Sequence, residues 1–120
     1  MHSPINEHLG LETVDHDDGT VELRLVTGPE HVNEVGLVHG GLTSFLLDGA
    51  MGRAVGRTLE AGGVCATVQL SVQFLSPARG TLRSVGRVTK RGKRVAFAEA
   101  ECRTEKGELV ARAHGTWALR

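Results

Sequence analysis

Residues 40–59 read GGLTSFLLDGAMGRAVGRTL, and this segment determines the architecture that we expect. Its apolar side chains recur at helical spacing and, over the first three turns, cover most of the circumference of a helix. Gly62-Gly63 follows and ends the helix. A helix that is apolar on nearly every side has to be buried on several of them, so the rest of the chain must surround it.

The segments on both sides of this helix have the two-residue period of β-strands. Residues 1–8 show no clear pattern, a short strand leads in from Leu9, and a turn at 15–19 precedes a strand over 21–26. After a loop at 28–38 and the helix, we expect four more strands, at 64–74, 82–88, 95–104 and 109–119. Within the first of these four, apolar side chains alternate with Thr67, Gln69, Ser71 and Gln73.

Together these elements predict one α+β domain over residues 1–120, with an antiparallel β-sheet wrapped around one long central helix. A length of 120 residues suits a single domain, and 40% hydrophobic with 23% charged residues is ordinary for a globular protein. The 14 basic residues balance 14 acidic ones, whereas a nucleic-acid-binding protein usually has a basic excess. The composition therefore disfavours a nucleic-acid partner.

The cysteines and the apolar segments indicate the compartment. Cys65 and Cys102 lack metal-ligand spacing, and no signal peptide is visible, so we expect reduced thiols in a cytoplasmic protein. The longest apolar stretch, around residues 42–51, contains Asp48 and is too short to span a bilayer. We therefore expect no membrane partner.

The polar residues around the start of the helix form the candidate site. Asn33 precedes His39 by six residues, Gly40-Gly41 opens the helix, and Asp48 follows His39 by nine residues. In these residues the chain resembles the PaaI-type thioesterases of the hotdog superfamily, and weaker similarity extends over roughly residues 9–119. The resemblance implies the hotdog fold, hydrolysis of acyl-CoA thioesters, and an obligate dimer that often pairs into a homotetramer.

The helix start can bind negative charge. The first N–H groups of a helix have no internal partner and carry the positive end of its dipole. A thioester carbonyl develops negative charge during acyl transfer, so we predict that the Gly40 N–H polarises it and that Gly41 helps to bind the substrate. The alternative is that the two glycines only make a tight turn into the helix.

Asp48 is the candidate catalytic carboxylate. It lies on a helix that is apolar nearly all round, and a buried carboxylate is costly without partners. Its role would be that of a nucleophile on the thioester carbon or of a general base for water. The alternative is a structural aspartate that is hydrogen-bonded to Thr67, Ser71 or a neighbouring backbone group.

The spacing of Gly40 and Asp48 predicts an oligomer. The two residues are eight positions apart on one helix, which is about 12 Å along its axis, so one carbonyl group cannot touch both. They can act on one substrate only if they come from different subunits. Two helices packed antiparallel across a two-fold axis would achieve this, which predicts a homodimer with shared active sites.

The resemblance implies three further catalytic-site residues. His39 could cap the helix, orient the carbonyl-binding loop or donate to the thioester oxygen. Asn33 could bond the same loop or an attacking water, and Thr67 matches a family position whose hydroxyl faces the acidic residue. The alternative for each is a purely structural role.

The phosphates of CoA need cations at the mouth of the site. The candidates are basic residues that cluster in the second half of the chain: Arg79, Lys90, Arg91, Lys93 and Arg94. The alternative is a solvated strand face and hairpin. We expect no metal ion and no cofactor other than the CoA of the substrate, because the remaining histidines have no metal-ligand spacing. No Gly-x-Ser-x-Gly motif occurs either, which disfavours serine hydrolase chemistry.

Two other functions remain open from the sequence: a hotdog hydratase or dehydratase acting on acyl thioesters, and a non-catalytic acyl-CoA-binding module. The acyl group is expected to be aryl or medium-chain. The four aromatic residues Phe45, Phe74, Phe97 and Trp117 could line an acyl pocket, although we favour core packing for each.

Overall fold

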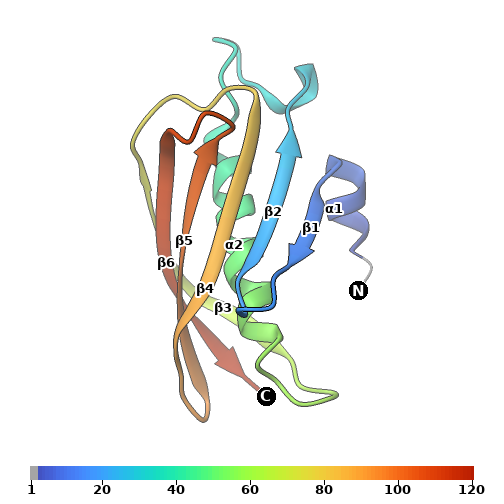
Figure 1. Cartoon of the computed structure of the whole chain (residues 1–120), viewed down its shortest axis with the longest axis vertical. Coiled ribbons are helices and arrows are strands. Elements are labelled where there is room, and N and C mark those ends of the chain that lie inside the picture. The colour runs from blue at the N-terminus through green and yellow to red at the C-terminus, as the bar shows by residue number, and fades with distance from the viewer. Residues whose placement is uncertain (1–2) are drawn as a thin grey trace.

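Helix α2 (Gly40–Gly56) lies against the inner face of a curved antiparallel sheet in the computed structural model, which describes residues 3–120 (Figure 1). The order of strands across the sheet is β1-β2-β4-β5-β6-β3. Their bounds are Glu12–Asp15 for β1, Val21–Val26 for β2, Cys65–Phe74 for β3, Thr81–Arg91 for β4, Val95–Thr104 for β5 and Leu109–Leu119 for β6. The predicted α+β architecture, a sheet around one long helix, is confirmed.

The structure adds two short helical elements that the sequence pattern did not predict. Helix α1 (Pro4–Leu9) has Ser3 as its N-cap and ends at Gly10, whose φ of 79° is in the left-handed region that glycine adopts readily. A 3₁₀ turn, η1 (Pro29–His31), lies in the loop before α2. Elements this short contain too few turns to show a helical period, so only their capping residues could have indicated them. Residues 1–2 lie outside the described part of the chain.

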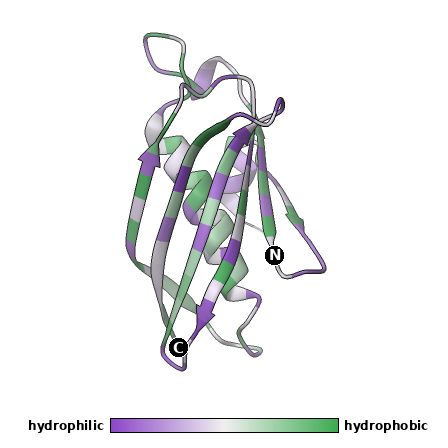
Figure 2. Ribbon diagram, turned by 60° about the vertical axis from the view of Figure 1, so that its left-hand side comes forward, coloured by the Kyte–Doolittle hydropathy of each residue, from purple (hydrophilic) through white to green (hydrophobic). Residues whose placement is uncertain are grey.

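The core forms where α2 meets the sheet. Leu46, Leu47 and Met51 are fully buried on the helix, and small alanines at alternate positions of β5 leave room for it. On β4, a Cβ atom at Gly86 would come within 2.7 Å of the α2 backbone at Ala50, so helix and sheet are in direct contact there. Figure 2 shows the matching pattern, with apolar residues along α2 and alternating hydropathy along the strands.

Strand β3 forms one edge of the sheet and pairs only with β6. It is ten residues long, and Val68 and Phe74 are 65% and 58% exposed. A long edge strand with exposed apolar side chains is a template for pairing with another chain. The face of α2 beside it is only half-covered, since Phe45, Asp48 and Gly52 are partly exposed. The helix predicted to be buried on several sides is therefore incompletely covered in a single chain.

A β-bulge at Val68 changes the faces of β3. The register with β6 shifts between Thr67 and Gln69, so Val68 is the extra residue. Thr67 consequently faces α2 together with Leu70, although regular alternation would place these two side chains on opposite faces. The simple alternation expected over 64–74 is wrong at this point, because it takes no account of a bulge.

Candidate active site

Asp48 and Thr67 meet between α2 and β3. The Thr67 hydroxyl donates a 2.8 Å hydrogen bond to Oδ1 of Asp48. The bulge at Val68 makes this contact possible by turning Thr67 toward the helix. Asp48 is half-buried in the single chain, so its carboxylate is both held in place and open to a ligand on the uncovered side of α2.

Cys65 is a thiol in the same neighbourhood, two residues before Thr67 on β3. Its Sγ lies 3.6 Å from the carbonyl oxygen of Gly52. Burial raises the pKa of the Cys65 thiol, and the nearby negative charge of Asp48 raises it further. Burial alone raises the pKa of Cys102 in the core to about 12. Both cysteines are free thiols that stay protonated at neutral pH, which makes them weak nucleophiles beside the carboxylate.

The start of α2 leaves a single backbone donor available within its first turn. Nδ1 of His39 accepts a 2.9 Å hydrogen bond from the Gly41 N–H, so His39 is the N-cap of the helix. The His39 carbonyl oxygen accepts from the N–H groups of Leu42, at 2.9 Å, and Thr43, at 3.2 Å. The Gly40 N–H has no partner among residues 3–120. Of the two predicted glycines, the structure therefore singles out Gly40 as the open donor.

Asn33 organises the loop that leads into the helix. Its side-chain oxygen accepts hydrogen bonds from the N–H groups of Val35 and Leu37, each at 3.1 Å. Its backbone N–H donates to the Leu37 carbonyl at 2.8 Å. The structure thus places Asn33 in the loop-bonding role, which was one of the two roles considered from the sequence.

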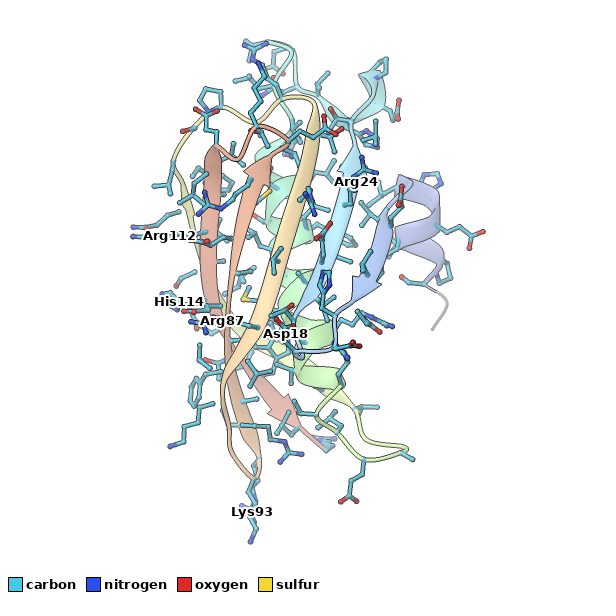
Figure 3. All side chains as sticks on the ribbon, viewed as in Figure 1. Asp18, Arg24, Arg87, Lys93, Arg112 and His114 are labelled. Atoms are coloured by element: carbon cyan, nitrogen blue, oxygen red, sulfur yellow. The ribbon has the colours of Figure 1, made fainter. Side chains whose placement is uncertain are left out.

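The predicted cations lie near opposite ends of helix α2. Arg79 follows Ala78, whose carbonyl accepts a 2.9 Å hydrogen bond from the Val38 N–H just before α2 begins. Arg91, in contrast, donates to Thr58 at 3.4 Å, beyond the other end of α2. Lys93 projects from the tip of the hairpin that joins β4 to β5 (Figure 3). Since 17 helical residues span about 25 Å, one chain cannot gather these cations around one CoA.

The aromatic side chains divide between core and surface. Trp117 is 1% exposed, so the predicted core packing is confirmed for it. Core packing is wrong for Phe74 and for Phe97, which is 43% exposed on β5. A Cβ at Gly40 would lie 3.5 Å from the Phe74 ring, so this exposed ring is beside the open N–H donor.

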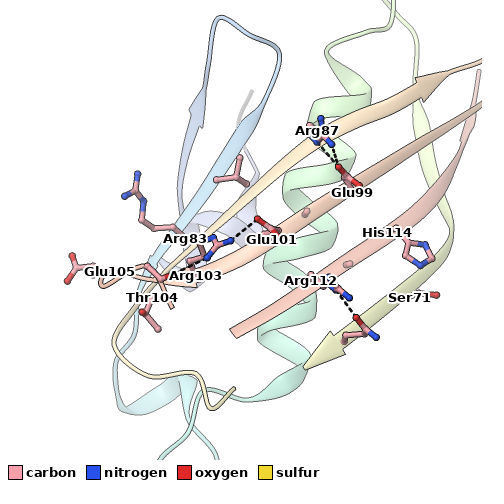
Figure 4. A pocket seen from close by; sticks show the side chains of 15 residues that line it. Ser71, Arg83, Arg87, Glu99, Glu101, Arg103, Thr104, Glu105, Arg112 and His114 are labelled. Atoms are coloured by element: carbon pink, nitrogen blue, oxygen red, sulfur yellow. Dashed lines mark hydrogen bonds and ion pairs between the residues drawn. The ribbon is translucent and has the colours of Figure 1, made fainter. Parts of the chain in front are cut away.

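A depression of about 1030 Å³ lies on the outer face of the sheet and away from Asp48 (Figure 4). Three of its four arginines are paired with glutamates, Arg83 with Glu22, Arg87 with Glu99 and Arg103 with Glu101, and Arg112 donates to the neutral amide of Gln73. Because most of this positive charge is paired within the chain, the depression is a poor site for an anion, and we place the chemistry at α2. No group of three or more His, Cys, Asp or Glu side chains is arranged to hold a metal ion in the described part of the chain.

Comparison with known proteins decides the family. Residues 35–111, more than half of the chain, match the family model described as Thioesterase superfamily. The chain belongs to the thioesterase superfamily. The thioesterase family that the sequence indicated is thereby confirmed.

Several superfamily members are similar over most of the chain. Acyl-coenzyme A thioesterase 13 of Homo sapiens is 31% identical over 101 residues, covering 82% of this chain and 71% of the relative. A protein of Caenorhabditis elegans named as an esterase is 35% identical over 98 residues, covering 79% of this chain. The chain spans little more than half of the length of that nematode relative, 57%.

Solved structures confirm the hotdog architecture. A Bacillus halodurans protein crystallised with CoA superposes with a TM-score of 0.93 at 33% identity, over 99% of this chain and 80% of that one. A phenylacetic acid degradation-related protein of Ralstonia eutropha gives a TM-score of 0.90 at 34% identity, over 98% and 92% of the two chains. The predicted PaaI-type resemblance is confirmed. Within residues 3–120, no helix is long and apolar enough to cross a membrane.

Proposed function

We propose that this thioesterase-superfamily chain hydrolyses an acyl-CoA thioester to the free acid and CoA. The observation that carries the proposal is the half-covered face of α2, which presents the Gly40 N–H and the Asp48 carboxylate. The similarity to acyl-coenzyme A thioesterase 13 and to a protein crystallised with CoA supports the substrate class.

In the proposed reaction the thioester carbonyl oxygen accepts a hydrogen bond from the Gly40 N–H at the positive end of the helix dipole. Asp48 then either attacks the carbonyl carbon or removes a proton from the water that does so. The carbon–sulfur bond breaks, and the CoA sulfur leaves and takes up a proton. In the first route, water then hydrolyses the mixed anhydride between Asp48 and the acyl group, which releases the free acid and restores the carboxylate. In both routes the net change is hydrolysis of the carbon–sulfur bond.

The proposed site contains two subunits. Gly40 and Asp48 are about 12 Å apart along α2, so each reaches the same carbonyl only from different chains. The exposed β3 edge and the half-covered face of α2 beside it are surfaces that a second copy would cover. An antiparallel pairing of two α2 helices would also bring Arg91 and Lys93 of one subunit toward Arg79 of the other, so that cations from both subunits can bind one CoA.

The predicted homotetramer needs a second interface in addition to β3. The outer face of the sheet supports it, because arginines and glutamates alternate there in nearly equal number (Figure 4). Such a face is compatible with a second copy of itself across a two-fold axis. Light scattering of the purified protein measures the number of subunits.

For the acyl group, we propose an aryl or medium-chain substituent that contacts Phe74. This ring is 58% exposed and lies beside Gly40, where the acyl carbon has to be placed. Aromatic rings bind either flat aryl groups or alkyl chains. A panel of acyl-CoA esters that varies aryl and aliphatic groups separately distinguishes these two classes.

The decisive assay measures thiol release from this panel with the wild-type protein and Asp48→Asn side by side. The substitution keeps the shape of the side chain and its acceptor for Thr67 but removes the negative charge. We expect kcat to fall by roughly a thousandfold or more, the size of effect expected for loss of a catalytic group. If the wild type releases no thiol from any ester, the protein is instead a hydratase or an acyl-CoA-binding module.

A further inference from the structure

His31 is a buried histidine that the reaction described above does not use. It lies at the end of η1 and is 6% exposed. Its Nδ1 accepts a 2.8 Å hydrogen bond from the Gly28 N–H, and its Nε2 lies 3.2 Å from the carbonyl oxygen of Leu9 at the end of α1. The ring therefore joins two segments that are about 20 residues apart in the sequence.

These two contacts require the neutral ring with its proton on Nε2. In that tautomer Nδ1 accepts from Gly28 while the Nε2–H donates to the Leu9 oxygen. A protonated imidazolium carries hydrogen on both nitrogens, so Nδ1 would oppose the Gly28 N–H with a second donor. Protonation of the ring is thus incompatible with the Gly28 hydrogen bond.

The backbone of His31 is connected to the start of α2. Its carbonyl oxygen accepts a 3.0 Å hydrogen bond from the N–H of His39, the residue that caps the helix and precedes Gly40. One residue further on, Val32 and Val38 form an isolated antiparallel bridge. These two contacts hold together the two sides of the Asn33 loop, residues 31–32 and 38–39. His31 is the last residue of η1 and the first residue of this paired region.

We infer that His31 is a positioning residue for the Gly40 N–H, and that it holds the start of α2 in place only while its ring is neutral. The role in catalysis rests on the proposed function, whereas the structural link does not. Protonation would release Gly28, loosen η1 and displace the His31 carbonyl that anchors His39. The thioesterase would then lose activity on acidification through a group that does not touch the substrate.

Glu30 supplies an alternative partner for the protonated ring. Its Oε1 lies 3.5 Å from Nδ1 of His31, so a proton on Nδ1 could pair with this carboxylate in place of the Gly28 contact. Glu30 is the charged side chain that the described residues place against the ring. The two hydrogen bonds of the ring are to neutral backbone groups, and the titratable residues next to these segments in the sequence are Glu7 and His8, before Leu9 on α1; His39 donates its N–H to the His31 carbonyl.

The test is an NMR titration of the full-length protein from about pH 8 to about pH 5, which covers the ordinary range of histidine. It follows the ring signals of His31 and the backbone amides of Gly28 and Gly40, with the Gly41 amide as a separate reporter of His39. We expect the Gly28 and Gly40 amides to shift with the midpoint of the His31 ring. The protection of Gly28 from hydrogen exchange should fall about tenfold or more across the same range.

Three variants complete the test. His31→Gln keeps an acceptor and a donor but does not titrate, so the shared transition should disappear and the acid limb of kcat should flatten. Glu30→Gln should move the transition to lower pH, and it keeps the test valid if His31→Gln does not fold. The matched control is His114→Gln, at an exposed histidine on β6, which should behave as the wild type does.

Two results would overturn the inference. One is a Gly28 amide that stays unchanged and protected to about pH 5, whether or not the His31 ring titrates. The other is a Gly40 transition that persists in His31→Gln. Neither result depends on thiol release, so the inference can fail while the thioesterase proposal stands. Conversely, a protein without thioesterase activity can still show the coupled titration.

Discussion

At the scale of single residues, the N–H of Gly40 can be removed without removing the helix. Proline lacks this donor and is favoured at the first position of a helix. The preceding residue, His39, has φ −58° and ψ 131°, a conformation that is compatible with a following proline. We predict that Gly40→Pro lowers kcat by about a hundredfold or more, the typical effect of losing an oxyanion donor. Thiol release measures it.

Gly40→Ala is the matched control for that substitution, because it retains the N–H. Its Cβ would be 3.5 Å from the Phe74 ring, an ordinary contact distance, so the fold should tolerate it. We expect alanine to keep most of the activity that proline removes. Equal losses in the two variants would mean that crowding at Gly40, not the missing donor, slows the reaction.

At the scale of secondary-structure elements, an ion pair between β2 and β4 should make stability depend on pH. Arg83 donates two 3.0 Å hydrogen bonds to the nearly buried carboxylate of Glu22, which lowers the pKa of Glu22 below its ordinary value although burial opposes the change. A carboxyl group whose pKa is lowered by folding contributes stability above its unfolded pKa. That contribution is lost as the pH falls through the folded value.

We therefore predict that the free energy of unfolding falls when the pH is lowered from about 5 to about 3, and that Glu22→Gln shows a smaller fall. Urea unfolding at fixed protein concentration across this range measures both proteins, because association also affects stability. Glu108→Gln, at an exposed position before β6, is the control. Parallel pH dependence in the wild type and Glu22→Gln would show that other carboxyl groups account for the acid response.

At the scale of the whole molecule, a shared site predicts that two inactive variants rescue each other. In a mixed dimer of Asp48→Asn and Gly40→Pro, one of the two sites combines an intact Gly40 with an intact Asp48 from the other subunit. Mixed dimers can be purified after co-expression with two different affinity tags. We expect about half of the wild-type activity, because one of two symmetric sites is restored.

The control for this experiment pairs Asp48→Asn with a chain that carries both substitutions, which leaves no intact site in either arrangement. It should remain as inactive as the single variants. If the mixed dimer of the two single variants is equally inactive, Gly40 and Asp48 do not act together across the interface. The two-subunit site would then be wrong even if the protein hydrolyses acyl-CoA.

Local patterns in the sequence determined most of the fold and the chemical type of the site. The apolar circumference of 40–59 and the two-residue period of the strands depend on neighbours a few positions away, so both can be read without coordinates. The grouping of Asn33, His39, Gly40 and Asp48 is equally local, since it follows a loop directly into one helix. The superfamily and the candidate carboxylate follow from these residues.

Only the tertiary structure decided which groups at the site are available. The bulge that turns Thr67 toward Asp48 depends on pairing with β6, nearly 50 residues later. The burial of His31 between α1 and η1 likewise depends on a long-range contact, to Leu9, 22 residues away. Such contacts join residues with no fixed spacing, so no periodicity in the sequence could reveal them, whereas the His39 cap on Gly41 is local and was one of the roles considered from the sequence.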